Sequence, residues 1–315
     1  MTDIVIKDRP ETENAAVRPS KAQWLTSLAK IGADHGFFER IGKRHSALHV
    51  REGDVLLVTF DEAERVYAEN NDGLPSGFDS VRRRDWSLLN IMTTKQGWFR
   101  EEALYAFFDK LIDDGFFDQF DQVIFQGFGP MCGYAACAYS VAAPGSQVVA
   151  TSPAASLDRE DVPFELRFRN KRRTDFHTRF AYAPDMVEAA ENVSIIYDPF
   201  DTLGAAHAAQ FRGPQVTHFR LRWGGPELHR IWDDSGLTSR LLRAVSGKKM
   251  TPARVAAFAR DARRHDRAYL TRVADYAIAT GKPERAIVVL RHAANATGDP
   301  HFSDRADALA ARQPD

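Results

Sequence analysis

The sequence is poor in cysteine, in net charge and in long apolar runs. It has 2 cysteines in 315 residues, Cys132 and Cys137, and a formal net charge of −1. Two thiols five positions apart on one helix point about 140° away from each other, which disfavours a disulfide and favours a reduced compartment. The balanced charge lacks the basic footprint expected of a nucleic-acid-binding protein. No stretch has the length of a membrane span and the N-terminus has no basic start followed by an apolar run, so we predict a cytoplasmic protein without a membrane partner.

The stretch Asp121–Tyr139 organises the chain. The apolar run 123–125 is too short for a helix and enters the turn 127–130 (GFGP), after which small and apolar residues recur at helical spacing. A strand, a sharp turn and a helix packed through small residues form the geometry of a nucleophile elbow. The segment 131–136 (MCGYAA) resembles the sequence that follows the serine in the α/β-hydrolase superfamily. The resemblance covers residues 45–245 and implies a three-layer α/β fold with a mostly parallel sheet.

The elbow residues Gly129, Pro130 and Met131 include no serine. If Pro130 stands at the nucleophile position, that position has no nucleophile, and its ring prevents the positive φ that the position requires. If Gly129 stands there, the backbone is satisfied but no side chain is present. Pro130 then lacks the N–H that supplies half of the oxyanion hole. In either register we predict that serine hydrolase chemistry is lost.

The pattern divides the chain into three parts. Residues 1–20 are polar and predict a mobile tail. Residues 21–248 alternate apolar runs with helical stretches, which predicts the α/β-hydrolase-like domain; within it, 46–50 and 54–60 flank a turn signal and predict a hairpin. Residues 249–315 read as helices separated by Gly-Lys-Pro and Gly-Asp-Pro and predict a small helical appendage, which is a candidate surface for a protein partner.

A basic segment at 158–183 interrupts the strand–helix alternation and is a candidate cap. Its arginines and histidine include Arg169, Arg172, Arg173 and His177, with Asp175 as the single nearby acid. Because the guanidinium fork matches phosphate, sulfate and carboxylate groups, these residues are candidates for binding a small anionic ligand. The alternative is a solvated basic face that pairs with acids elsewhere.

The remaining triad positions keep the order of the superfamily. Asp201 or Asp198 follows a predicted strand at 193–197, and His229 follows the last predicted strand at 216–221. The resemblance implies that Asp201 and His229 are the triad acid and base; His229 also fits a loop histidine bonded to a backbone carbonyl. Cys132, in the first turn of the helix, is a candidate nucleophile because the helix dipole favours a thiolate.

The stretches GPMCGYAA and SVAAPG also resemble alphaproteobacterial proteins that are often labelled phosphoadenosine phosphosulfate reductases. Members of that reductase family carry a Ser-Gly-Gly phosphate loop and a C-terminal cysteine within Glu-Cys-Gly. Neither pattern occurs here, and no cysteine follows Cys137.

Three functions remain open at this point. The first is a non-hydrolytic α/β-hydrolase-like protein that binds a small anionic metabolite or a glycan precursor. The second is a hydrolase or transferase that uses Cys132 with His229 and Asp201. The third is an interaction or scaffold protein that uses the helical appendage and the aromatics near Trp223 and Trp232. A sulfonucleotide reductase is a fourth and weaker reading, and none of the patterns predicts a metal or a cofactor.

Overall fold

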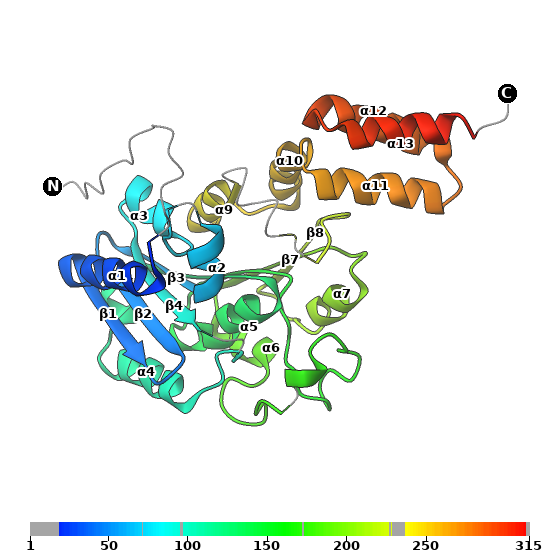
Figure 1. Ribbon diagram of the computed structural model, residues 1–315. Helices are drawn as coiled ribbons and strands as arrows, with labels where there is room; N and C mark the ends of the chain where they lie inside the picture. The colour runs from blue at the N-terminus through cyan, green and yellow to red at the C-terminus, as the bar shows by residue number, and fades with distance from the viewer. Residues whose placement is uncertain are drawn as a thin grey trace.

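The strands of the chain lie side by side in a single sheet. The computed structural model describes residues 19–70, 72–94, 97–171, 173–226, 228 and 237–312. Within these residues the sheet has eight strands in the order β1-β2-β4-β3-β5-β6-β7-β8 (Figure 1). β2 pairs antiparallel with β1 and with β4, and all the other neighbours pair parallel. The strands are β1 (Gly36–Ile41), β2 (His45–Val50), β3 (Val55–Glu62), β4 (Ser87–Thr93), β5 (Gln122–Phe128), β6 (Gln147–Thr151), β7 (Asn192–Tyr197) and β8 (Val216–Arg220).

Helices connect the strands and cover the sheet. Of the described residues, none forms a helix long and apolar enough to cross a membrane. The α-helices are α1 (Lys21–His35), α2 (Ala63–Glu69), α3 (Phe78–Arg84), α4 (Glu102–Asp113), α5 (Gly129–Tyr139), α6 (Ala183–Met186), α7 (Thr202–Ala208), α9 (Leu237–Ser246), α10 (Pro252–Arg263), α11 (Arg267–Ala279), α12 (Pro283–Thr297) and α13 (Pro300–Ala310). Short 3₁₀ helices are η1 (Phe117–Gln119), η2 (Ser140–Ala142), η3 (Arg169–Lys171) and η4 (Val187–Ala189).

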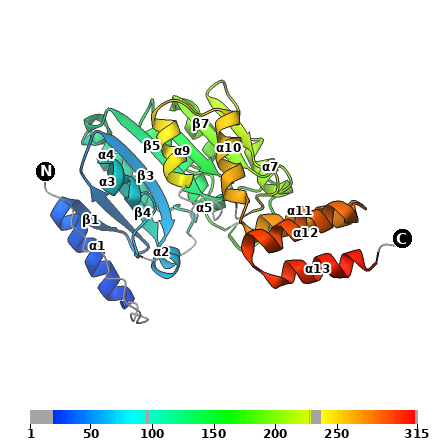
Figure 2. The ribbon, with the colours of Figure 1, turned by 90° about the horizontal axis from the view of Figure 1, so that it is seen from above.

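Two hydrophobic cores lie on the two faces of the sheet. One core contains the apolar sides of α4 and α5, and the other contains those of α1, α2, α3, α9 and α10. Seen from above, α9 and α10 cross one face of the sheet (Figure 2). Because both faces are covered, burial does not alternate along the central strands; every residue of β2, β4 and β6 is buried. The chain therefore has the predicted three-layer, mostly parallel, α/β-hydrolase-like fold.

The predicted hairpin of residues 46–50 and 54–60 is wrong. β2 and β3 are consecutive in the sequence, but both pair with β4, which lies between them. The apolar sequence of β4 fits between two buried strands, and its Asn90 amide donates to Thr59 at 2.8 Å and to Asp61 at 2.7 Å. The turn after β2 therefore leads to a strand two places away in the sheet.

The C-terminal helices form a small unit beside the sheet, as predicted for a helical appendage. Helices α11, α12 and α13 enclose their own core, which includes Leu270, Leu290 and Phe302. α10 connects this unit to the sheet and buries Val255 and Ala259 in the second core. In Figure 1 the three helices lie beyond β8 and α7, at the end of the sheet opposite to β1.

Candidate functional site

The turn between β5 and α5 has the strained backbone of a sharp strand-to-helix bend. Gly129 has φ +74°, a conformation that suits glycine, and Pro130 lies in the first turn of α5. Of the two registers considered above, the observed dihedral angle places the strained point at Gly129. Gly127 allows the close approach of strand and helix, since a Cβ atom there would lie 2.0 Å from the carbonyl oxygen of Cys132.

The last two residues of β3, Asp61 and Glu62, bring carboxylates to the same edge of the sheet. Asp61 is buried and accepts hydrogen bonds from the backbone N–H of Ser76 at 2.9 Å and from its hydroxyl at 2.7 Å. Burial raises the pKa of Glu62, and Arg65 opposes that rise. The end of β3 therefore presents two carboxyl groups at this edge, with Arg65 3.9 Å from Asp61.

Cys132 does not have the environment of a reactive thiol. Its side chain is buried, with a residue exposure of 5%. Burial raises the pKa of the thiol far above its ordinary value, Arg65 opposes this, and Asp61 and Glu62 raise the pKa further. The helix dipole is outweighed, so the thiolate that we expected from the position in α5 is disfavoured. Cys137 is also buried and free.

Asp198 joins the loops that follow β7 and β8. Its carboxylate accepts from the backbone N–H groups of Phe200 at 2.9 Å, Trp223 at 3.2 Å and Gly225 at 2.8 Å. These contacts give the buried Asp198 a role in positioning both loops. Asp201, the other candidate acid, precedes α7 and lies 3.8 Å from Arg167. His229 lies outside the described residues.

A buried ionic network that the sequence did not reveal links the segment after β6 to α7. His207 Nδ1 accepts from the N–H of Ala155 at 3.1 Å, so the neutral ring donates from Nε2 to Glu165 at 2.8 Å. Arg167 also donates to Glu165, at 2.6 Å from a terminal nitrogen. Burial alone would raise the pKa of Glu165, but the hydrogen bonds from His207 and Arg167 outweigh it and lower the pKa to about 2.

The basic segment is a packed part of the domain in which several cations have partners. His177 lies 2.8 Å from Asp158, and Arg179 forms a two-pronged ion pair with Asp109. The expectation that Asp175 is the nearby acid is therefore wrong, since Asp109, Asp158 and Glu165 also neutralise this segment. Arg169 and Arg173 are exposed at the surface, and Arg172 lies outside the described residues.

Arg100 fastens this segment to the domain. Its Nε donates to the carbonyl oxygen of Asp175 at 2.9 Å, and its terminal nitrogens donate to Thr178 Oγ1 at 2.9 Å and to the carbonyl oxygen of Arg179. The guanidinium group is itself buried. Three hydrogen bonds from one buried cation hold the segment closed against the domain.

A cavity of about 530 Å³ lies at the carboxyl edge of the sheet, between the loops after β7 and β8 and helix α11. Its size is within the range of about 300–1,000 Å³ that is common for small-molecule sites. Asp201 lines this cavity, whereas Cys132, Arg169, Arg173 and His177 do not. The side chains that define it are Asp198, Phe200, Asp201, Trp223, Arg272 and Asp275.

Three aromatic rings gather beside this cavity. Phe200 stacks on Trp223, with ring centres 4.0 Å apart and planes inclined by 17°. Tyr276 of α11 packs on Trp223 at 4.4 Å. Phe200 and Tyr276 remain 48% and 45% exposed, so the cluster lies open to solvent. We refer to Phe200, Trp223 and Tyr276 as the aromatic platform.

Trp223 is held in an unfavourable backbone conformation. Its φ of +67° is rare for a bulky residue. The carboxylate of Asp198 binds its N–H, and Arg272 Nε donates to its carbonyl oxygen at 2.8 Å. Arg272 also donates to the carbonyl oxygen of Gly224 at 2.6 Å. Two charged groups thus fix the backbone at Trp223, and strain maintained in this way is a feature of binding sites.

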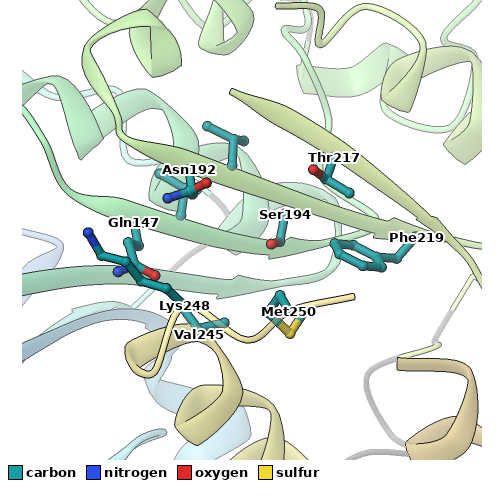
Figure 3. Close-up of a pocket in the computed structure, with 10 residues that line it drawn as sticks. Gln147, Asn192, Ser194, Thr217, Phe219, Val245, Lys248 and Met250 are labelled. Carbon is teal, nitrogen blue, oxygen red and sulfur yellow. The ribbon is translucent and has the colours of Figure 1, made fainter. Parts of the chain in front are cut away.

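A second, smaller cavity of about 80 Å³ lies at the opposite edge of the sheet (Figure 3). Gln147 and Asn192, the first residues of β6 and β7, line it together with Lys248. Figure 3 shows Ser194 on the sheet and Met250 facing each other across it. The Nε2 atom of buried Gln147 has no partner among the described residues. The polar lining and the small volume suit a few ordered water molecules.

Comparisons with known proteins give structural likeness only. No family model and no curated protein matches the chain. Brefeldin A esterase, a bacterial homologue of human hormone-sensitive lipase, is 16% identical over 78% of this chain and 89% of its own, with a TM-score of 0.42. Carboxyl esterase 2 from the fungus Tuber melanosporum is 14% identical over 65% and 81% of the two chains, with a TM-score of 0.41. The capsule O-acetyltransferase of Neisseria meningitidis serogroup A is 8% identical over 62% and 90%, with a TM-score of 0.39. Such values carry no argument about function, and the fold class rests on the strand order and directions themselves.

Proposed function

We propose that this protein is a non-hydrolytic α/β-hydrolase-like protein that binds a small polar metabolite, an anionic compound or a glycan precursor, at the carboxyl edge of its sheet. The observation that carries the proposal is Gly129. At φ +74° it occupies the bend between β5 and α5, where a hydrolase of this fold carries its nucleophile, and it has no side chain.

The surroundings of Gly129 support a loss of acyl-transfer chemistry. Pro130, the next residue, has no N–H to donate to a developing oxyanion. The turn from β3 into α2, which would supply the second donor, is formed by the carboxylate residues Asp61 and Glu62 at the end of β3, and α2 follows directly. Negative charge at this place opposes the charge that develops on a tetrahedral intermediate.

The thiol of Cys132 does not replace the missing serine in this proposal. It is buried within α5, and its pKa is raised rather than lowered. A nucleophilic cysteine needs thiolate character and access to the substrate. Cys132 has neither, so we assign it to packing between β5 and α5.

The cavity beside the aromatic platform supports the binding part of the proposal. It lies outside the carboxyl end of β7, which is where open α/β sheets bind ligands. Asp198, in the loop after β7, accepts a hydrogen bond from the loop after β8, and Arg272 of α11 donates to that same loop. The three elements that surround the cavity are thus held together. A site positioned by buried hydrogen bonds is preorganised for a ligand.

Hydrolysis of p-nitrophenyl acetate and p-nitrophenyl butyrate by the purified full-length chain tests the proposal. We expect the rate to equal that of the His229→Ala variant and of an unrelated protein at the same concentration. The Gly129→Ser variant should also remain inactive, because Pro130 still lacks its N–H. A wild-type rate well above background that is lost in His229→Ala would rule the proposal out.

A further inference from the structure

We infer that the ligand of the 530 Å³ cavity is an uncharged saccharide, whose ring packs on the aromatic platform and whose hydroxyl groups donate to the carboxylates of Asp201 and Asp275. This inference rests on the proposed function and selects one of its two ligand classes.

The aromatic platform offers the exposed ring surfaces of Phe200 and Tyr276 beside the cavity. The faces of aromatic rings carry partial negative charge and attract weakly positive C–H groups, which a sugar ring presents on one of its faces. Phe200 and Trp223 are stacked directly on each other, so no space is left between them for a ligand. The arrangement is therefore a surface for stacking and not a cage around a cation, which would need separated ring faces.

The polar lining provides acceptors for hydroxyl groups. Asp201 and Asp275 both line the cavity, and each has a cationic neighbour: Arg167 lies 3.8 Å from Asp201, and Arg305 donates to one oxygen of Asp275 at 2.6 Å. Each carboxylate can still accept further hydrogen bonds, because it has about four lone-pair sites. Hydroxyl groups that donate to such carboxylates form charge-assisted hydrogen bonds.

The same lining disfavours a phosphate or a carboxylate ligand. Among the described residues, three carboxylates and one arginine line the cavity. The guanidinium of Arg272 already donates from Nε and from one terminal nitrogen to the carbonyl oxygens of Trp223 and Gly224. An anion in the cavity would therefore meet an excess of negative charge. Arg169 and Arg173 are exposed but lie outside the cavity, so they do not offset this charge.

Ligand-observed saturation-transfer NMR on the full-length protein tests the inference. The probes are the methyl glycosides of glucose, galactose, mannose and N-acetylglucosamine, with inorganic phosphate titrated separately by calorimetry. We expect at least one glycoside to bind, and we expect Trp223→Ala to weaken that binding by about tenfold or more, through loss of one stacking partner. Trp223→Phe, which keeps a ring face, should retain most of the affinity. Val288→Ala, which removes a side chain that is 68% exposed on α12, serves as the matched control and should change nothing.

The outcomes separate this inference from the proposed function. Absence of binding by every glycoside, or equal affinity in Trp223→Ala with the circular dichroism spectrum unchanged, overturns the saccharide. If phosphate binds and Trp223→Ala abolishes that binding, the saccharide inference is also overturned, whereas the proposed non-hydrolytic binding function is not. If Trp223→Ala does not fold, Asp201→Asn replaces it, and an undiminished affinity in that variant overturns the inference. Ester hydrolysis, in contrast, bears only on the proposed function.

Discussion

Replacing Glu165 with glutamine should remove a stabilisation that depends on pH. Glu165 is 2% exposed and accepts hydrogen bonds from His207 and Arg167, which together hold its pKa at about 2, below the ordinary value of 4.5. A carboxyl whose pKa is lowered on folding stabilises the protein above the unfolded pKa, and this stabilisation is lost as the pH falls towards the folded pKa. The relevant window is therefore pH 4.5 to 2.

The size of the effect follows from the shift. A difference of about 2.5 pKa units corresponds to about 3 kcal/mol at neutral pH, of which about 1 kcal/mol is lost by pH 3.5. Glu165→Gln should accordingly unfold at lower urea concentration than the wild type at pH 7, because Arg167 then lacks a buried counter-charge. The difference in the free energy of unfolding between the wild type and Glu165→Gln should be smaller by about 1 kcal/mol at pH 3.5 than at pH 7.

Urea unfolding followed by tryptophan fluorescence at pH 7 and pH 3.5 measures this gap. Glu160→Gln is the matched control, since Glu160 is an exposed carboxylate five residues away in the same segment. The control should follow the wild type at both pH values. The assignment of the charged network would be refuted if Glu165→Gln were less stable than the wild type by the same amount at both pH values, or equally stable at pH 7.

Three further predictions concern the packing around α5 and the segment that Arg100 holds. Gly127→Ala should destabilise the protein by about 3 kcal/mol or more, measured by urea unfolding, because the added Cβ would meet the backbone of α5 at 2.0 Å; a loss below 1 kcal/mol would contradict this contact. Neither Cys132 nor Cys137 should react with iodoacetamide in the native protein at pH 8, while both should react in urea, because burial raises the pKa of each thiol. Arg100→Ala should speed hydrogen exchange in residues 175–180, since it removes two hydrogen bonds to backbone carbonyl oxygens there; unchanged exchange would show that other contacts hold the segment.

The fold class could be predicted because its signals are local. The apolar run before Gly127 and the small residues after Pro130 describe a strand and a buried helix within one stretch of sequence. The register of the bend could not be predicted, since both Gly129 and Pro130 lack a nucleophile and only the dihedral angle of Gly129 distinguishes them. The hairpin prediction failed because a turn signal does not reveal that β4 lies between its neighbours.

The candidate site was less accessible from the sequence because its contacts join distant segments. Asp201 was predicted as a triad acid from its place after a strand, and that role stays a prediction. The aromatic platform combines Trp223 with a tyrosine from α11, and Arg272 reaches Trp223 across 49 residues. The pairing of Glu165 with His207 spans 42 residues in the same way. No local pattern encodes such a pair, nor the pairing of Arg179 with Asp109, which lies 70 residues earlier in the sequence.

The order of the strands also affects how copies of this protein meet in solution. Within the part of the chain that the structure describes, β1 and β8 are the outermost strands, and each has one side that pairs with no other strand. Such borders can recruit a strand from another molecule. Here both are short and bear exposed charges, Glu39 and Arg40 on β1 and Arg220 on β8. If the edge strands of two molecules paired, these charged side chains would lie at the new strand–strand contact. Their desolvation disfavours such pairing and so protects the protein against aggregation through its sheet edges.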